Sequence, residues 1–583
     1  MGYQFGLIDE GYKHTKALND RWPGKEAIQL VGARNQSIAF QVLVKAEEAL
    51  ILSVTDAPVF SPRGPLPCLR LQLTGMEEMG CRVSMYLEGM VEDDDHDMKA
   101  DLLLHQECIT VEQGEIQPVW VEIAVPKEGV AGVLNGKVQI YGHRLFEDEI
   151  KIGELDVTLD VKDVVLPDPA DYTFFLDLWQ HLSNISRKHE VPLWSEEHFR
   201  VVEFYVKSLA ELGQKAVTIV ATEIPWSGQG CFNTRDDLAD LFEYNMARVY
   251  KGKEGKWRYD FSVMDRYIEL CFSYGIDEEI EVFGLSNIWM FPEAGYGKLI
   301  EDFPDGCRVR YLDEEDGTYK YMRTSQELYD YIKALESHFI QKGWMDRVRI
   351  VADEPADTAL YRERISLLKR IAPSFTFKTA INHAEFIQEF KDEVQDYVPV
   401  LPCVAQEWEL VQKLKKEMDG RICWYVCCWP PLPNTFIGSP LPESCLIGWL
   451  TGYMGLDGFL RWNYTVWPEN PREKIAYRFP HWAAGDTNFV YPARDGRPLL
   501  TLRYKLLKRG IEDFELIKRI EREHPNPDEV LKKAYSMILR AEDIAEFHPD
   551  REKKREELYS LNYKDYQEAR KLLLEELENL SSL

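Results

Sequence analysis

Short apolar segments alternate with helix-patterned segments along the middle of the chain, and this alternation constrains the fold more than any other feature. Eight segments have the length of buried strands: TFFLDLW (173–179), AVTIVAT (216–222), EIEVFGL (279–285), RVRIVA (347–352), FTFKTAI (375–381), YVPVLP (397–402), RICWYVC (421–427) and GFLRW (458–462). Eight strands alternating with helices predict a (β/α)8 TIM-like barrel over 172–510, with 286–346 as an inserted loop plus helix. An open, doubly wound sheet is the alternative that the strand count leaves open.

Helix-boundary signals separate these strands. In SEEHFRVVEFYVKSLAELG, Ser195 is predicted to cap the helix and Gly213 to end it, because serine accepts backbone N–H bonds and glycine adopts left-handed backbone angles. A second helix is predicted in SQELYDYIKALESHFIQKG, ending at Gly343.

The chain before residue 165 has the two-residue periodicity of half-buried strands. In GELDVTLDVKDVV, apolar residues alternate with polar ones. Several such strands with few helical patterns predict an antiparallel β-sandwich over 1–165, and two prolines in LPDPADY (166–172) mark its boundary. Residues 511–583 are predicted as helices packed on the barrel, which makes the chain a multidomain α and β protein.

The charge balance limits the partners. A formal charge of −30 repels phosphate backbones and anionic headgroups, so no nucleic acid partner and no membrane insertion are expected. The first residues, MGYQFGLIDEGYKHTK, lack the apolar stretch of a secretory signal. Eleven cysteines in apolar contexts suit reduced, buried thiols. We therefore expect a cytoplasmic protein, and a homo-oligomer remains open.

The segment IVADEPAD (350–357) ends a predicted strand on two neighbouring carboxylates, Asp353 and Glu354. A barrel places its active site at the carboxyl ends of its strands. Adjacent strand residues face opposite sides, so both carboxylates reach one site only if the chain leaves the strand between them, and Pro355 is expected to bias Glu354 toward extended or polyproline geometry. Two close carboxylates raise one pKa, which provides a general acid. The alternative is that DEPAD only caps the next helix.

Other predicted strand ends carry aromatic and amide side chains, which suit the apolar face and hydroxyl edge of a sugar ring. Core packing is the alternative for any single tryptophan. The candidate substrate-binding residues are Trp179 and His181 after the first strand, Asn382 and His383 after the fifth, Tyr425 and Asn434 in CWYVCCWPPLPNTF, and Trp462, Tyr464 and Trp467 in RWNYTVW.

Metal chemistry fits the sequence poorly. Cys423, Cys427 and Cys428 are close in sequence, but on a strand Cys427 and Cys428 would face apart, and no second ligand pair of zinc spacing follows. Phosphate-loop, dinucleotide and nucleophilic-serine motifs do not match either. We predict no metal and no cofactor.

With these residues in view, the chain resembles glycoside hydrolase family 123, the β-N-acetylgalactosaminidases. The matching stretches are LDLWQHLSNISRKHEVPLWSEEHF, VADEP, CWYVCCWPPLPNTFI, GWLTGYMGLDGFLRWNYTVW, GDTNFVYPA and LRYKLLKRGIEDFELI, in order over about 174–520. The N-terminal sandwich matches in kind more than in residues. Trp429-Pro430-Pro431 departs from the family, where many relatives have a smaller residue first, and this departure affects the leaving-group side.

The resemblance implies a retaining, substrate-assisted glycosidase acting on glycan or glycolipid oligosaccharides, in which the substrate's 2-acetamido carbonyl attacks the anomeric carbon and forms an oxazolinium ion. By motif position, Asp353 orients and polarises the acetamido group and Glu354 is the acid/base. Trp462, Tyr464 and Trp467 are implied to wall the acetamido methyl or donate to its carbonyl, and Asn382, His383 and Asn434 to contact ring hydroxyls.

Two other functions remain alternatives. One is a β-hexosidase that uses carboxylates from two strands, for example Glu354 with Glu223. The other is a glycan-binding protein that holds sugar without cleaving it. The preference for galacto over gluco substrates comes from the resemblance alone.

Overall fold

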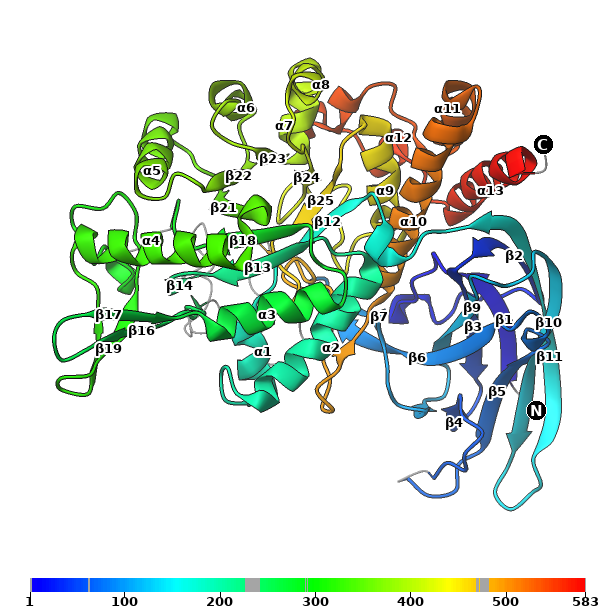
Figure 1. The fold of residues 1–583 in the computed structure, drawn as a ribbon. Coiled ribbons are helices and arrows are strands. Elements are labelled where there is room, and N and C mark those ends of the chain that lie inside the picture. Colours follow the sequence, from blue (N-terminus) through cyan, green and yellow to red (C-terminus); the bar gives the residue numbers. More distant parts are fainter. Residues whose placement is uncertain are drawn as a thin grey trace.

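The structure, a computed structural model, describes residues 3–60, 63–225, 242–288, 290, 292–467, 471 and 482–581. Figure 1 shows two regions: blue and cyan sheets formed by the start of the chain, and beside them the strands and helices formed by the rest. The chain therefore combines a β-rich N-terminal region with a larger region of mixed strands and helices.

Two sheets form the N-terminal region. The first has the order β1-β3-β9-β6-β7 and the second β2-β11-β10-β5-β4-β8. Their strands are β1 (Tyr3–Asp9), β2 (Ala27–Arg34), β3 (Gln36–Ala46), β4 (Leu50–Ser53), β5 (Cys68–Thr74), β6 (Arg82–Glu92), β7 (Met98–Leu103), β8 (Cys108–Val111), β9 (Ile116–Val125), β10 (Gly132–His143) and β11 (Ile150–Val165). On β11 the alternate residues Leu155, Val157, Leu159 and Val161 are buried, which confirms the strand periodicity.

The prediction that this region is antiparallel was wrong in part. The first sheet is antiparallel, but in the second β11 pairs parallel with β2 and β4 pairs parallel with β5. Parallel pairs need a connection that crosses back over the sheet. The chain between β4 and β5, residues 54–67, is long enough for that crossing, so periodicity alone does not reveal the strand direction.

Each of the eight apolar segments of the middle region contains a strand. The strands are β12 (Phe175–Leu178), β13 (Ala216–Val220), β18 (Glu279–Phe283), β21 (Val348–Asp353), β22 (Thr376–Ile381), β23 (Asp396–Pro399), β24 (Trp424–Tyr425) and β25 (Gly458–Arg461).

These strands form two parallel sheets, β13-β18-β21-β22-β23 and β12-β25-β24. Isolated parallel bridges connect the sheets at Leu176–Gln214, Tyr397–Ile422 and Val400–Tyr425. Each strand thus lies beside its neighbour in sequence, and the first lies beside the last. This order favours a barrel over an open sheet, and the closed (β/α)8 barrel remains our interpretation.

Helices alternate with these strands. They are α1 (Leu182–His189), α2 (Glu196–Leu212), α3 (Ser262–Ser273), α4 (Ser325–Lys342), α5 (Thr358–Ile371), α6 (Glu385–Phe390), α7 (Leu401–Gln406), α8 (Trp408–Glu417), α9 (Pro442–Met454), α10 (Leu502–Glu523), α11 (Pro527–Ile538), α12 (Arg555–Leu558) and α13 (Tyr563–Ser581). The Ser195 hydroxyl accepts a bond from His198 N, and Gly213 and Gly343 end α2 and α4 with positive φ, which confirms the predicted boundaries.

The stretch 286–346 contains more than the predicted loop and helix. β19 (Arg310–Asp313) and β20 (Thr318–Tyr321) form a hairpin that joins β16 (Arg248–Lys251) and β17 (Trp257–Asp260) in a four-stranded sheet. These strands were missed because each is only four residues long and mostly half-buried, without a run of apolar residues. The remaining short strands are β14 (Ile224–Pro225), β15 (Phe242–Glu243), β26 (Tyr491–Pro492) and β27 (Pro498–Leu499).

The C-terminal helices contact both regions. Helix α10 crosses the predicted boundary at 510, and it packs against α9 where Gly448 meets Gly510: a Cβ on Gly448 would lie 1.8 Å from the Gly510 carbonyl oxygen. Helix α13 contacts β2 and β11 as well as α10 and α11. The division of the chain into three domains stays a prediction.

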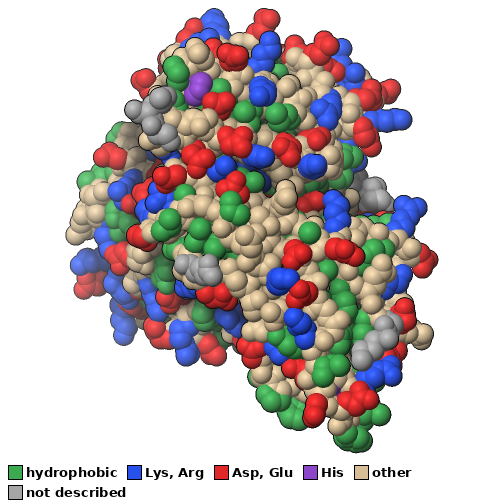
Figure 2. All heavy atoms as spheres, turned by 90° about the vertical axis from the view of Figure 1, so that its right-hand side faces the viewer, with side chains coloured by type: hydrophobic (Ala, Val, Ile, Leu, Met, Phe, Trp, Pro, Cys, Tyr) green, Lys and Arg blue, Asp and Glu red, His purple; other side chains and the backbone are tan. Residues whose placement is uncertain are grey.

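The surface carries both signs of charge. On the face drawn in Figure 2, which looks onto the N-terminal sheets, acidic and basic side chains are interspersed. Among the described residues, no helix has the length and apolar character needed to cross a bilayer.

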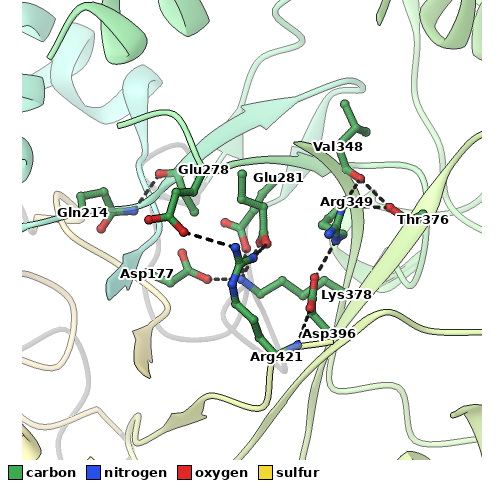
Figure 3. A network of polar contacts seen from close by, with 12 residues as sticks. Asp177, Gln214, Glu278, Glu281, Val348, Arg349, Thr376, Lys378, Asp396 and Arg421 are labelled. Atoms are coloured by element: carbon green, nitrogen blue, oxygen red, sulfur yellow. Dashed lines mark hydrogen bonds and ion pairs between the residues drawn. The ribbon is translucent and has the colours of Figure 1, made fainter. Parts of the chain in front are cut away.

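A buried ionic cluster lies among the central strands. Lys378 Nζ of β22 lies 2.6 Å from Asp177 of β12 and 2.8 Å from each of Glu279 and Glu281 of β18. Figure 3 shows Lys378 reaching toward Asp177, with Arg349 paired to Asp396 nearby. Burial alone would lower the pKa of Lys378, but the three carboxylates raise it well above its usual range.

Lys378→Met is expected to lower the free energy of unfolding by about 3–5 kcal/mol, because it leaves buried carboxylates without their cation. The measurement is urea denaturation, with Lys256→Met as the control, since Lys256 and its partner Glu254 are 81% and 78% exposed. A loss below about 1 kcal/mol, the range of exposed pairs, would contradict the structural role of the cluster.

Candidate active site

Strand β21 ends at Asp353, where a proline and a helix cap follow. Pro355 has no N–H with which to extend the strand ladder. The Asp357 side chain accepts a bond from Leu360 N at 2.8 Å and caps α5. The segment DEPAD therefore does cap the next helix, as the alternative predicted, but through Asp357, and Asp353 and Glu354 do not fill that position.

The chain turns sharply between the two carboxylates. Glu354 has φ +44°, in the left-handed region, and its N–H still donates to Ala380 O of β22 at 2.9 Å. Pro355 was expected to hold Glu354 in an extended conformation, and that expectation was wrong. The left-handed turn takes the chain off the strand at Glu354, at a cost of about 1–2 kcal/mol for a non-glycine residue. Strain of this kind is common at functional sites.

The two carboxyl groups influence each other's titration. Burial, and then the charge of Glu354, raise the pKa of Asp353 to about 8. Burial also raises the pKa of Glu354, while a bond from the Tyr425 hydroxyl to Glu354 Oε1 and the charge of His383 act against it. Both shifts favour the protonated form of the pair, as a general acid near neutral pH requires.

A polar chain holds the peptide between the two carboxylates. Asn287, in the loop after β18, donates through Nδ2 to the Asp353 carbonyl oxygen. Arg364 of α5 donates to Asn287 Oδ1 at 2.7 Å and lies 3.1 Å from Asp305. Asp305 accepts the Asn287 N–H at 2.9 Å. Sequence reasoning missed these residues, although Asn287 lies only two residues after the end of a predicted strand.

Asn287→Gly is expected to lower kcat about 10- to 100-fold with little change in KM, because the Asp353–Glu354 peptide loses its side-chain support. Glycine accepts the φ of +53° at Asn287, so the variant removes the contact without adding backbone strain. Steady-state kinetics measures the effect. Asn35→Gly is the matched control: Asn35 has φ +61° and donates to Leu166 O in the N-terminal region. Equal kinetics in both variants would contradict this role.

The first strand brings an aromatic wall to the site. Trp179 is buried, and its ring meets Phe283 edge-on at 4.9 Å. Both line a cavity of about 30 Å³ beside Asp353, together with Val351. His181 is buried too, and burial lowers its pKa to about 3, so it is neutral at physiological pH.

Of the candidate substrate-binding residues, Asn382 and His383 are exposed, whereas Asn434 is hydrogen-bonded to other residues of the protein. Asn382 and His383 are exposed after β22, and His383 is close enough for its charge to affect Glu354. Asn434 is buried; it donates to Cys427 O at 2.9 Å and accepts from Arg461 at 2.7 Å. Asn434 thus fixes the loop that follows Tyr425, and its contact with a ring hydroxyl stays a prediction.

The aromatic residues after β25 separate into two groups. Trp462 Nε1 lies 3.4 Å from Asp486 Oδ1, and its ring neighbours Trp482. Tyr464 instead shares a 2.7 Å hydrogen bond with Ser208 of α2, and Trp467 donates to Val490 O and packs near Tyr205 of α2. These contacts favour a core-packing role for Tyr464 and Trp467 over contact with a substrate.

A buried ion pair supports Asn434 and Trp462 together. Arg461 lies 2.7 Å from Asp486, and both side chains are fully buried. Burial raises the pKa of Asp486 to about 6 against the opposing charge of Arg461. Sequence reasoning did not single out either residue, although GDTNFVYPA, which carries Asp486, is one of the stretches that resemble the family.

Comparisons with known proteins identify a family and a similar fold. Residues 179–520 match the family described as glycoside hydrolase 123, catalytic domain. A family 123 glycoside hydrolase from Clostridium perfringens, whose structure was described for glycolipid glycan hydrolysis, has a similar fold with a TM-score of 0.73 and 17% identity, covering 100% of this chain and 98% of that one. A β-D-glucuronidase from Dictyoglomus thermophilum aligns at a TM-score of 0.29 and 11% identity, over 87% of this chain and 68% of its own. No curated protein matches the sequence.

Proposed function

Because the chain belongs to glycoside hydrolase family 123, we propose that it is a retaining exo-β-N-acetylgalactosaminidase. Its substrates are terminal β-linked N-acetylgalactosamine residues of glycans or glycolipid oligosaccharides. The fold in this proposal is a (β/α)8 barrel whose strand ends carry the site. The observation that carries the proposal is the Asp353–Glu354 pair, where the chain leaves the strand through a left-handed residue and the pKa of each carboxyl group is raised.

Substrate binding decides which of the two carboxyl groups, Asp353 or Glu354, carries a proton. In the proposed complex the acetamido N–H donates to Asp353, which favours the ionised form of Asp353, and the negative charge of Asp353 then favours the protonated form of Glu354. Asp353 then orients the acetamido group so that its carbonyl oxygen attacks the anomeric carbon. Glu354 protonates the leaving oxygen and later accepts a proton from the water that opens the oxazolinium ion.

The neighbouring residues have roles that follow from their chemistry. The aromatic cavity of Trp179 and Phe283 beside Asp353 suits the acetamido methyl group. Tyr425 holds Glu354 through its hydroxyl. The exposed His383 and Asn382 are placed to contact ring hydroxyls or the leaving sugar.

The two-strand β-hexosidase is less well supported. Glu223 accepts a bond from Tyr321 at 2.8 Å and lies 2.7 Å from Arg310, so both of its oxygens have partners away from Glu354. The charge that raises the pKa of Asp353 comes from Glu354, which identifies the neighbouring pair as the interacting carboxylates. A glycan-binding protein without catalysis would gain nothing from a strained acid pair.

A panel of aryl β-glycosides tests the proposal. The expected result is release of the aryl group from the N-acetylgalactosaminide at a rate above those of the N-acetylglucosaminide and of the galactoside without the acetamido group. Binding without release would favour the glycan-binding alternative, and equal release from the galactoside would favour the β-hexosidase.

A further inference from the structure

Two neighbouring cysteines lie on the loop that follows Tyr425. β24 ends at Tyr425, so Cys427 and Cys428 do not face opposite sides of a strand as the sequence predicted, and their Sγ atoms are 3.9 Å apart. Cys428 is exposed and Cys427 is half-buried, which also contradicts the prediction of buried thiols. Among the cysteines of the described chain, Cys428 is the exposed one.

We propose that Cys427 and Cys428 form a redox modification site, in which a peroxide converts the thiol pair to an intramolecular disulfide and thereby lowers turnover at the adjacent site. The effect on turnover rests on the proposed function, whereas disulfide formation does not.

The chemistry balances in two steps. The Cys428 thiolate attacks one peroxide oxygen, the O–O bond breaks, and the hydroxide that leaves takes up the thiol proton as water. Cys427 sulfur then attacks the sulfenic acid at Cys428, an S–S bond forms, the S–O bond breaks, and a second water leaves with the Cys427 proton. Two thiols are oxidised by two electrons and one peroxide is reduced.

Cys428 is the more exposed thiol and Cys427 has a raised pKa, as the two reaction steps require. Exposure makes Cys428 the thiol that meets a solvent oxidant first. The hydrogen bond with Cys428, and then burial, raise the pKa of Cys427 well above its usual range, which disfavours direct oxidation of Cys427 by the peroxide. The two sulfurs already lie 3.9 Å apart, which gives attack within the chain an advantage over attack by another molecule.

Closure would disturb the contacts that position the active site. The Cys427 thiol donates to Trp429 O at 3.4 Å, and the Cys427 carbonyl accepts from Asn434. Bringing the sulfurs from 3.9 Å to the bonded distance of about 2.05 Å requires this loop to shift, and Cys427 takes part in both of these contacts. Cys427 follows Tyr425, the partner of Glu354, by two residues, and the Glu354 charge acts on the Cys427 thiol.

The test uses the full-length reduced protein and hydrogen peroxide. After treatment the remaining thiols are alkylated under denaturing conditions, and the tryptic peptide 422–461 is weighed. The expected peptide has lost two alkyl labels and two hydrogen atoms, with labels kept on Cys423 and Cys445. Turnover of the aryl N-acetylgalactosaminide is expected to fall about ten-fold, the size of one lost charge-assisted hydrogen bond, and to recover with dithiothreitol.

Variants separate the outcomes. Cys428→Ser is expected to keep its turnover through the treatment, Cys427→Ser to stop at a trappable sulfenic acid, and Cys108→Ser, in β8, to respond as the parent does. A peptide that keeps all four labels, a disulfide between two chains, or closure with unchanged turnover would overturn the proposal. If the untreated protein has no glycosidase activity, the proposed function fails, while the peptide mass still tests the disulfide.

Discussion

Glu354→Gln is expected to lower kcat/KM on a natural β-linked N-acetylgalactosaminyl oligosaccharide by about 10²–10⁴-fold, the usual contribution of a general acid. The amide has the shape of the acid and still accepts the Tyr425 hydroxyl bond, but it cannot protonate the leaving oxygen. The loss should be smaller for aryl substrates whose leaving group needs no proton. Kinetics on both substrate types measures the difference.

Azide and an exposed carboxylate away from the site supply the controls for this variant. Azide attacks the oxazolinium ion without a general base, so it is expected to restore turnover of the aryl substrate by Glu354→Gln. Glu254→Gln changes a carboxylate that is 78% exposed and should leave both activities unchanged. Glu354→Gln with more than about a tenth of the parent activity on the oligosaccharide would remove Glu354 from the acid/base role.

Asp353→Asn is expected to lower kcat about 10²–10³-fold even on aryl substrates with good leaving groups, the effect of losing one electrostatic stabiliser of the transition state. The acetamido N–H loses its anionic acceptor, so ring closure slows whatever the leaving group. Glu354→Gln and Asp353→Asn thus differ in how strongly their effects depend on the leaving group. Full activity of Asp353→Asn on an aryl substrate would contradict substrate-assisted catalysis.

The stability of Asp353→Asn provides an independent check that the variant is folded. The raised pKa means that the native protein binds more protons than the unfolded chain between about pH 4 and pH 8, so its stability falls as pH rises across that window. Asparagine does not titrate, so the variant loses the contribution of Asp353 to the change of unfolding free energy with pH, which is at most about 1.4 kcal/mol per pH unit. The variant should therefore be at least as stable as the parent at pH 8, as urea denaturation can measure.

Periodicity and strand-end position predicted much of this molecule. The eight central strands, the caps at Ser195 and Gly213, and the place of Asp353 and Glu354 at the end of β21 follow from local patterns of apolar residues, helix caps and proline. These features depend on neighbours in sequence, which a single sequence displays.

The features that the sequence did not reveal depend on long-range contacts. The direction of β2 against β11 is set by chain crossings, the left-handed turn at Glu354 by its bond to Ala380 and by Asn287, and the burial of Tyr464 by Ser208 on a distant helix. The aromatic residues of RWNYTVW therefore look alike in the sequence, but Trp462 lies beside Asp486 whereas Tyr464 contacts Ser208.

Participation of the substrate's own acetamido group is tested most directly by aryl β-N-acylgalactosaminides in which the acetyl methyl carries none, one, two or three fluorine atoms. Fluorine withdraws electrons from the carbonyl oxygen, and the leaving group stays the same. If that oxygen is the nucleophile, kcat/KM is expected to fall with each fluorine, by about 100-fold or more over the series, which corresponds to a barrier increase of about 2.7 kcal/mol. Rates that do not change across the series would contradict the account and point to a nucleophile supplied by the protein.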